Sequence, residues 1–202
     1  MAIRAVIIDF GGVLVRTEDR TTRQQLAERL GLSYPQLVEL IFDSESARLA
    51  TIGQITTDEH WEAIREKLGL SPEQLARVPD GFWGGDVLDT ELVDYLRALK
   101  GQCRVALLSN AWDDLRKELD EHWHISDAFD LIVISAEVGL AKPDPKIYRL
   151  ALEQLGVEPH EAVFVDDFLE NVNAASGVGM YAIHFQGSRA ARAALDELLN
   201  RE

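Results

Sequence analysis

One segment decides the fold: residues 3–12 read Ile3-Arg4-Ala5-Val6-Ile7-Ile8-Asp9-Phe10-Gly11-Gly12. The first six of these residues form a short and almost wholly apolar run, which is typical of a strand buried on both faces of a parallel sheet. The run ends at Asp9, and a pair of glycines then turns the chain. We therefore expect a buried first strand that delivers a carboxylate to one edge of a sheet.

Beyond residue 87, apolar runs alternate with helical patterns. Further strands are predicted at Cys103–Leu108, Leu131–Ile134, Glu161–Val165 and Met180–His184. Helices are predicted between the strands at Glu91–Leu99, Lys146–Leu155 and Asn171–Ser176. Asp89 is a suitable N-cap for the first of these helices, and Gly156 is a suitable stop for the second. This alternation predicts an α/β fold, with a Rossmann-like parallel sheet as the middle of three α/β/α layers.

Residues 17–87 have a different character, and we predict no strand in them. Helix starts of the form Ser/Thr-x-x-Glu/Gln recur at Ser33, Thr56 and Ser71. We therefore expect a small all-helical cap over residues 17–87, inserted into a core made of residues 1–16 and 88–202. Trp83 lies near the return to that core, where it could act as a hinge or line the pocket, but core packing is the expectation.

Composition narrows the range of functions. The chain has 202 residues, a formal net charge of −15 and a single cysteine, Cys103. The acidic surplus disfavours nucleic acid as a partner but not a small anionic substrate, because a few local cations can dominate one pocket. One cysteine excludes an intramolecular disulfide. No apolar run approaches the roughly 18 residues of a membrane span, and no leader pattern is visible, so we expect a cytoplasmic monomer or homodimer without a membrane partner.

Polar side chains gather where the predicted strands end. They are Asp9, Ser109, Asn110, Lys142, Asp166 and Asp167. The carboxyl ends of parallel strands share one edge, and ligands bind there. Three carboxylates at one place stay ionised only beside a compensating cation, and a set of oxygen ligands suits Mg²⁺. A lysine and a hydroxyl beside such a metal suit a phosphate group, and a carboxylate can also act as a nucleophile.

Four short motifs, taken in order, resemble those of the haloacid dehalogenase superfamily of hydrolases with a helical cap inserted after the first strand. The motifs are Asp9-Phe10-Gly11-Gly12-Val13-Leu14, Leu107-Leu108-Ser109-Asn110, Lys142-Pro143-Asp144-Pro145-Lys146-Ile147-Tyr148 and Val165-Asp166-Asp167-Phe168-Leu169-Glu170-Asn171-Val172. One motif alone is weak evidence, whereas four in register span nearly the whole chain. The resemblance implies a Mg²⁺-dependent phosphatase that hydrolyses a small phosphorylated metabolite.

The resemblance also implies roles in catalysis and substrate binding. Asp9 would attack phosphorus and become an aspartyl-phosphate, while Lys142 would neutralise the nucleophile and the transferring group. Ser109 would hydrogen-bond the phosphoryl oxygens. The other substrate-binding residues implied are Asn110, Gly11 and Gly12. On the side of the site that faces the cap, Arg16, Arg20 and Arg48 are the candidate contacts to a substrate anion.

The metal ligands implied by the resemblance are Asp9, the carbonyl of Gly11, Asp167 and, directly or through water, Asp166. Gly11 is also a departure from the family pattern, because most phosphatases of the superfamily carry a second aspartate there that protonates the leaving group. A general acid or base contributes about 10²- to 10⁴-fold, so its loss weakens catalysis without abolishing it. Asn171 is a second departure, since many relatives place a carboxylate at that position.

Two alternatives stay open on the sequence alone. A 2-haloacid dehalogenase also lacks the second aspartate, but it needs no metal and usually replaces the Asp166-Asp167 pair. A protein of this fold that has lost its acid could also be a non-catalytic binding module. Metal dependence separates the phosphatase from the dehalogenase, and trapping of phosphate on Asp9 separates a working nucleophile from a binding module.

Overall fold

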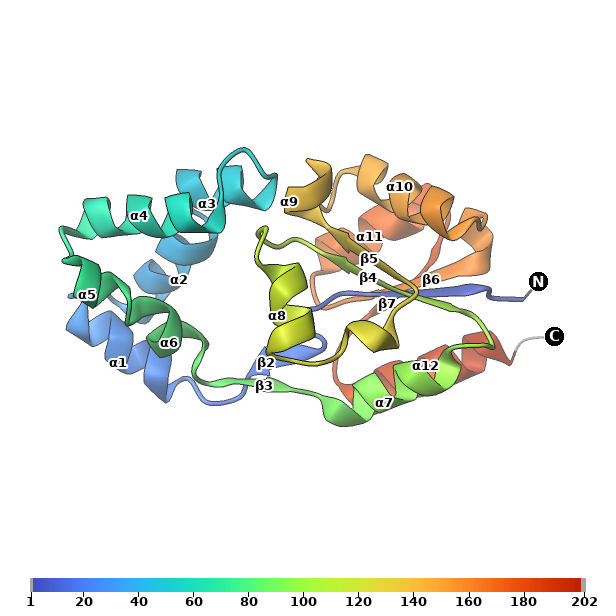
Figure 1. The fold of residues 1–202 in the computed structure, drawn as a ribbon. Coiled ribbons are helices and arrows are strands. Elements are labelled where there is room, and N and C mark those ends of the chain that lie inside the picture. The colour runs from blue at the N-terminus through green and yellow to red at the C-terminus, as the bar shows by residue number, and fades with distance from the viewer. Residues whose placement is uncertain (1, 201–202) are drawn as a thin grey trace.

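The computed structural model describes residues 2–200. A five-stranded parallel sheet forms one half of the molecule, in the order β5-β4-β1-β6-β7 (Figure 1). Its strands are β1 (Ala5–Ile8), β4 (Arg104–Ser109), β5 (Leu131–Ile134), β6 (Ala162–Asp166) and β7 (Tyr181–His184). Every predicted strand is present, with ends that differ from the prediction by at most two residues.

Helices cover both faces of this sheet. They are α7 (Thr90–Leu99), α8 (Leu115–Glu121), α9 (Ser135–Val138), α10 (Pro145–Leu155), α11 (Leu169–Val178) and α12 (Ser188–Leu199), with 3₁₀ turns η1 (Ser126–Ala128) and η2 (Pro159–Glu161). Because side chains alternate along a strand, Val6 and Ile8 join the core beneath α7, α8 and α12. Ala5 and Ile7 join the core beneath α10 and α11 on the opposite face. The predicted α/β/α layers are confirmed.

The other half of the molecule, which we call the helical part, lies between β1 and α7 in the chain. Its helices are α1 (Thr21–Arg29), α2 (Tyr34–Phe42), α3 (Glu45–Thr51), α4 (Thr57–Leu68), α5 (Pro72–Leu75) and α6 (Val78–Trp83). The predicted capping boxes at Ser33, Thr56 and Ser71 begin α2, α4 and α5. Leu37 and Ile41 are fully buried in a hydrophobic cluster that is separate from the two clusters of the sheet.

Two short strands carry the chain into and out of the helical part. β2 (Val15–Thr17) and β3 (Asp86–Leu88) pair antiparallel. The prediction that residues 17–87 contain no strand was therefore wrong at its two ends, because a three-residue strand is too short to show alternation. A Cβ on Gly85 would lie 1.9 Å from the carbonyl oxygen of Asp19, so a glycine is needed for this close approach.

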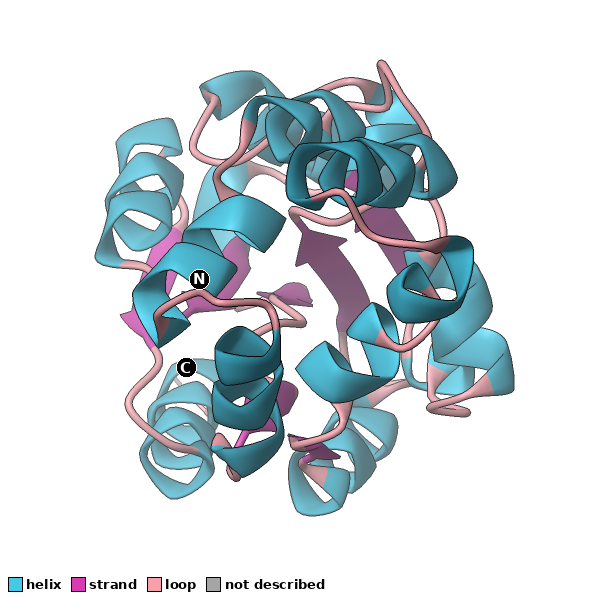
Figure 2. Cartoon of the chain, turned by 90° about the vertical axis from the view of Figure 1, so that its left-hand side faces the viewer, coloured by secondary structure: helices cyan, strands magenta, loops and turns pink. Residues whose placement is uncertain are grey.

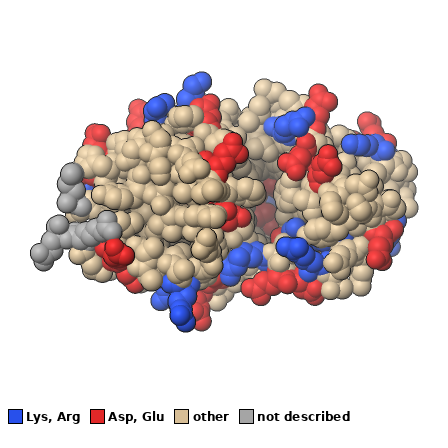
Figure 3. Space-filling model, turned by 180° about the vertical axis from the view of Figure 1, so that it is seen from behind, with Lys and Arg blue, Asp and Glu red and all other residues tan. Residues whose placement is uncertain are grey.

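The strands run from the side of the N-terminus toward the helical part, so their carboxyl ends face α1–α6 (Figure 1). Figure 2 views the molecule from the helical side, with the strands behind the helices. The molecular surface is hollowed between the two halves (Figure 3). The edge that collects the predicted polar residues therefore borders this hollow. Within residues 2–200, no helix combines the length and the apolar character needed to cross a membrane.

Candidate functional site

Asp9, Lys142 and Asp166 form a buried charge cluster at the carboxyl edge of the sheet. Ile8 of β1 pairs with Val165 of β6, so the register places Asp9 level with Asp166. The Nζ atom of Lys142 lies 2.8 Å from Asp9 Oδ1 and 2.6 Å from Asp166 Oδ2. Because these side chains are almost fully buried, their interactions are screened much less than those of surface charges. One ammonium group thus joins two carboxylates.

Both oxygens of the Asp166 carboxylate already have protein partners. The Oδ1 atom accepts hydrogen bonds from the Phe168 N–H at 2.7 Å and from Asn171 Nδ2 at 3.1 Å. The Oδ2 atom accepts from Lys142 Nζ and from Asn171 Nδ2, the latter at 3.1 Å. Asn171 is therefore a donor to both oxygens of Asp166. These contacts make Asp166 a fixed support for Lys142.

The neighbouring aspartate, Asp167, has a carboxylate oxygen that is free to accept a further ligand. Its Oδ1 atom is buried and has no hydrogen-bond partner among the residues that the structure describes. Carboxylate oxygens of Asp9, Asp166 and Asp167 lie within 4.8 Å of one another. A buried carboxylate oxygen without a partner is costly unless a cation or a donor completes it. The donor set therefore fits a hard divalent cation such as Mg²⁺.

Two of these carboxyl groups are electrostatically unfavourable as anions. Burial raises the pKa of Asp9 to about 7, with the Lys142 ammonium opposing this rise and the Asp166 charge adding to it. Burial, and then the charge of Asp166, also raise the pKa of Asp167. A bound divalent cation would reverse both effects by favouring the charged carboxylates.

Gly11 and Gly12, which follow Asp9, differ in how much space surrounds them. Gly12 has φ of 78°, and a Cβ on it would lie 2.2 Å from Asp167 Oδ2. Only a glycine therefore lets the turn after Asp9 approach the Asp167 carboxylate. A Cβ on Gly11 would meet nothing within 4 Å, so this position has room for a side chain.

Asn110 fixes the backbone of Lys142. Its Oδ1 atom accepts a hydrogen bond from the Lys142 N–H, and its Nδ2 atom donates to the Lys142 carbonyl, both at 2.8 Å. Ser109, which ends β4, lies buried directly before it. The Asn110 amide is thus used to orient the lysine, and Ser109 lies next to it at the end of β4.

Two residues just after this strand end, Trp112 and Asp113, reach the helical part. Asp113 Oδ1 accepts hydrogen bonds from the backbone N–H of Thr57 at 3.0 Å and from its hydroxyl at 2.6 Å, at the start of α4. The Trp112 ring packs on His60 and Trp61 of α4, with centroids 4.6 Å and 5.6 Å away. Sequence reasoning missed both residues. The signal that could have found them was their position beside a strand end.

The arginines that were expected to contact a substrate anion have protein partners. Arg16 pairs with Asp89 at 2.9 Å. Arg48 donates to a main-chain carbonyl at 3.0 Å, and the Arg20 guanidinium lies over an aromatic ring. A role for these arginines in substrate binding therefore stays a prediction without a supporting contact.

A carboxylate that is paired with a fixed lysine at the carboxyl edge of a parallel sheet is a group that can act as a nucleophile. A family model described as haloacid dehalogenase-like hydrolase matches residues 3–179, and the chain belongs to this family.

Similar proteins include named phosphatases. The sesquiterpene phosphatase astK of Aspergillus oryzae is 32% identical over 197 residues, which cover 97% of this chain and 96% of that protein. The D-ribitol-5-phosphate phosphatase of Bacteroides thetaiotaomicron is 26% identical over 207 residues, which cover 98% and 99%. A solved haloacid dehalogenase family enzyme of B. thetaiotaomicron, in complex with magnesium and inorganic phosphate, aligns with a TM-score of 0.75 at 27% identity over 90% of this chain and 93% of that one. This chain is an enzyme of the kind that hydrolyses phosphate esters.

Proposed function

We propose that this protein is a Mg²⁺-dependent phosphatase that hydrolyses small phosphomonoesters through an aspartyl-phosphate on Asp9. The observation that carries the proposal is the Asp9–Lys142 pair beside the open oxygen of Asp167. Together these groups offer a carboxylate for attack, a fixed ammonium and a carboxylate oxygen that can accept a cation. The two named phosphatases act on esters of very different alcohols, a sesquiterpene and a sugar alcohol, so the phosphate group is what their substrates share.

The reaction has two displacement steps at phosphorus. A carboxylate oxygen of Asp9 attacks phosphorus, the bond from phosphorus to the alcohol oxygen breaks, and that oxygen takes a proton from water. A water molecule then attacks the same phosphorus, the bond between phosphorus and Asp9 breaks, and inorganic phosphate leaves. Lys142 offsets charge on the transferring group, and the Ser109 hydroxyl donates to one of its oxygens.

The remaining site residues hold this arrangement in place. Asp9, Asp167 and the carbonyl of Gly11 would hold Mg²⁺, which when bound stabilises negative charge on the phosphoryl oxygens. Asp166 supports Lys142 through its side chain, and Asn110 supports it through its backbone. Both supports reduce the freedom of the ammonium, which is what an electrostatic contribution to catalysis requires.

We also propose that residues 17–87 act as a cap domain on the core of residues 1–16 and 88–202. The bonds from Thr57 to Asp113 tie this cap to the core beside the site. A closed cap excludes water while the aspartyl-phosphate forms. Because Gly11 supplies no acid, turnover should favour leaving groups that need little protonation, such as those of aryl phosphates, acyl phosphates and sugar 1-phosphates.

The proposed function is tested by phosphate release from para-nitrophenyl phosphate and a panel of metabolite phosphates. Wild type and Asp9→Asn are each assayed with Mg²⁺ and with EDTA. Asp120→Asn, which changes an exposed carboxylate on α8, is the matched control. We expect release that needs both Asp9 and Mg²⁺ and that Asp120→Asn leaves unchanged.

Release that persists in EDTA or in the Asp9→Asn variant would overturn this mechanism. If wild type releases no phosphate from any ester, chloride release from 2-chloropropionate identifies a dehalogenase. Binding of phosphate esters with neither reaction identifies a binding module.

A further inference from the structure

Three aromatic side chains meet where the helical part faces the sheet. The ring of Trp112, on the loop after β4, lies 6.4 Å from that of Phe42 at the end of α2 and 6.3 Å from that of Trp83 at the end of α6. The rings of Phe42 and Trp83 are in edge-to-face contact at 5.6 Å. We call Phe42, Trp83 and Trp112 the aromatic wall. Because Trp112 belongs to the sheet half, the wall lies at the junction of the two halves.

Much of the aromatic wall is open. Phe42 is 42% exposed and Trp83 is 36% exposed, whereas Trp112 is 8% exposed. The expectation that Trp83 packs inside the core was wrong, because its ring stays exposed while it contacts Phe82 edge to face at 4.7 Å. Large aromatic side chains gain most when they leave water, so neighbouring open rings beside a catalytic edge indicate a binding surface.

Trp112 lies close in the chain to Ser109, the residue expected to bind the phosphate. Trp112 follows Ser109 by three positions, which limits the separation of their Cα atoms to about 11 Å. Between them, the N–H and the carbonyl of Ala111 both hydrogen-bond the buried Ser135 hydroxyl, at 2.9 Å and 3.1 Å. A phosphate ester bound at Ser109 therefore carries its alcohol within reach of the wall.

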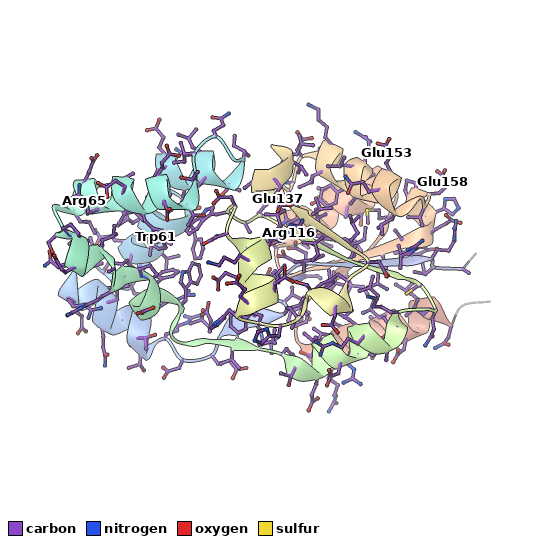
Figure 4. All side chains as sticks on the ribbon, viewed as in Figure 1. Trp61, Arg65, Arg116, Glu137, Glu153 and Glu158 are labelled. Atoms are coloured by element: carbon purple, nitrogen blue, oxygen red, sulfur yellow. The ribbon has the colours of Figure 1, made fainter. Side chains whose placement is uncertain are left out.

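The helix after the wall is also fixed to the sheet half. Arg116 of α8 donates two hydrogen bonds to the carboxylate of Glu137 in α9, at 2.7 Å and 2.6 Å. The two labelled side chains lie beside each other in Figure 4. A third bond joins Arg116 to the carbonyl of Ile132 at 3.1 Å. Trp112 is thus secured on both sides in the chain, so the wall can act as a rigid contact.

A second open apolar surface follows the metal-site aspartates. Phe168 is 65% exposed and Leu169 is 55% exposed. The backbone N–H of Phe168 donates a hydrogen bond to Asp166 at 2.7 Å, which holds the backbone of this residue beside the site. Strands β4 and β6 flank β1 in the sheet, so the segments that carry Trp112 and Phe168 follow the strands on either side of β1.

Arg23, whose guanidinium carbon lies 5.5 Å from the centroid of the Trp83 ring, has its polar partners inside the helical part. Arg23 is buried, pairs with Asp86 at 3.0 Å and stacks over the ring of Phe82 at 4.0 Å. Its guanidinium is therefore committed to holding α1 against α6 and β3. The wall presents rings, rather than a positive charge, to a bound molecule.

We propose that the aromatic wall and Phe168 bind the leaving group of the substrate, and that this group is an apolar alcohol. The substrate class is then a phosphomonoester of an aryl alcohol, in preference to a polyol phosphate, and alkyl phosphates serve as probes of the apolar contact. This inference rests on the proposed phosphatase function and extends it from the phosphate to the alcohol. Phe42 and Trp83 determine the specificity, because their open faces leave water only when an apolar group covers them.

The test uses linear alkyl phosphates from butyl to octyl, with glycerol 3-phosphate as the polyol. Leaving-group acidity barely changes along the alkyl series, so kcat/KM reports the apolar contact alone. We expect kcat/KM to rise about two- to fourfold for each added methylene. In the double variant Phe42→Ala/Trp83→Ala the series should become flat. Tyr181→Ala, which removes a 38% exposed ring on β7, is the matched control and should keep the rise.

Binding of n-octylphosphonate and methylphosphonate in Mg²⁺, measured by calorimetry, separates this inference from the proposed function. If no ester is hydrolysed, tighter binding of the octyl compound that is lost in the double variant still supports the apolar subsite. Hydrolysis or binding that does not depend on chain length would overturn the inference. So would a chain-length dependence that the double variant retains, provided that its circular dichroism matches wild type.

Discussion

The two ends of the site are built on different principles. The phosphate end lies on the sheet edge, where Lys142 joins Asp9 and Asp166 through short charged contacts. The leaving-group end lies largely on the helical part, where Phe42 and Trp83 are open to solvent and held by ring contacts. Charged hydrogen bonds are directional and fix a geometry, whereas apolar contacts act through area and tolerate differences in shape. The comparison teaches that chemistry and selectivity depend on separate stretches of this chain.

Removal of the Lys142 ammonium should impair catalysis at the phosphate end most severely. Lys142→Met leaves Asp9 and Asp166 facing each other without a cation, and the charge on the transferring group is no longer offset. We expect kcat to fall about 10³-fold, while the preference among alkyl phosphates changes little. Steady-state kinetics on the alkyl series measures both, with the exposed Lys146→Met on α10 as the control. A loss of chain-length preference together with kcat would show that the two ends are not separable.

The ionised Asp9 at the phosphate end should lower the unfolding free energy of the protein, whereas the aromatic residues of the apolar end carry no such charge. The pKa of Asp9 is raised in the folded protein to about 7, so the folded state binds this proton more tightly than the unfolded chain. The resulting stabilisation is complete below about pH 4 and is lost as pH rises through about 7. Asp9→Asn stays neutral and avoids this loss. In EDTA near pH 8, we expect its unfolding free energy to exceed that of wild type by about 2–4 kcal/mol.

Urea unfolding at pH 5 and pH 8 measures this effect. The gap between wild type and Asp9→Asn should be smaller at the lower pH, by more than half, and should shrink when Mg²⁺ is added at the higher pH. Parallel pH profiles for the two proteins would contradict the electrostatic account of Asp9.

The neighbouring aspartates should respond differently to the same substitution. Asp167→Asn removes an uncommitted oxygen and should raise the Mg²⁺ concentration for half-maximal activity about 10- to 100-fold. Asp166→Asn weakens the support of Lys142, so kcat should fall with little change in the Mg²⁺ requirement. Mg²⁺ titrations of activity distinguish the two variants. If the Mg²⁺ concentration for half-maximal activity rises equally in both variants, Asp166 is a direct metal ligand rather than a support for Lys142.

The open space at Gly11 allows a gain of function. An aspartate there would meet no atom within 4 Å of its Cβ and could supply the missing acid. We expect Gly11→Asp to raise kcat about tenfold on alkyl phosphates and much less on para-nitrophenyl phosphate, whose leaving group needs little protonation. Gly12→Asp is the matched control and should fail, because its Cβ would collide with Asp167. Equal gains on both substrates would contradict an acid role.

The smallest expected effect concerns the contact between the two halves. Thr57→Val removes the hydroxyl bond to Asp113 and keeps the backbone bond. We expect a cost of about 1 kcal/mol in docking of the helical part, seen as a severalfold rise in KM for octyl phosphate. Thr51→Val, which removes a hydroxyl bond inside α3, is the control and should leave KM unchanged. Equal KM values for both variants and wild type would show that this bond does not position the wall.

The sheet and its polar edge could be predicted from the sequence because both depend on local patterns. Apolar runs end at Asp9 and at Ser109, and a parallel sheet brings such ends together whatever the chain does between them. The starts of α2, α4 and α5 were predictable for the same reason, since a capping box is complete within four residues. Family resemblance then supplied a role for each residue at the edge.

The features that could not be predicted from the sequence depend on contacts between residues that are distant in the chain. Asp166 and Asp167 look alike in the sequence, and only the positions of Lys142 and Asn171 show which carboxylate is committed. No hydrophobic periodicity in the sequence identifies Trp112 as a packed residue, because it lies on a loop and its partners come from distant helices. The strands β2 and β3 were missed since each has meaning only as the partner of the other.

The β2–β3 pair has a consequence for how such a chain can change over evolution. Thr17, where the chain leaves the sheet half, is paired with Asp86, where it returns, and the Thr17 hydroxyl donates to the Asp86 carboxylate at 2.6 Å. The segment between Thr17 and Asp86 therefore connects to the sheet half in the same way as a long loop whose two ends lie side by side. The entropy of closing a loop grows only slowly with its length. Inserts of other sizes and sequences can therefore be exchanged at this point at little cost to the sheet, so that new substrates are acquired while the phosphate chemistry is inherited intact.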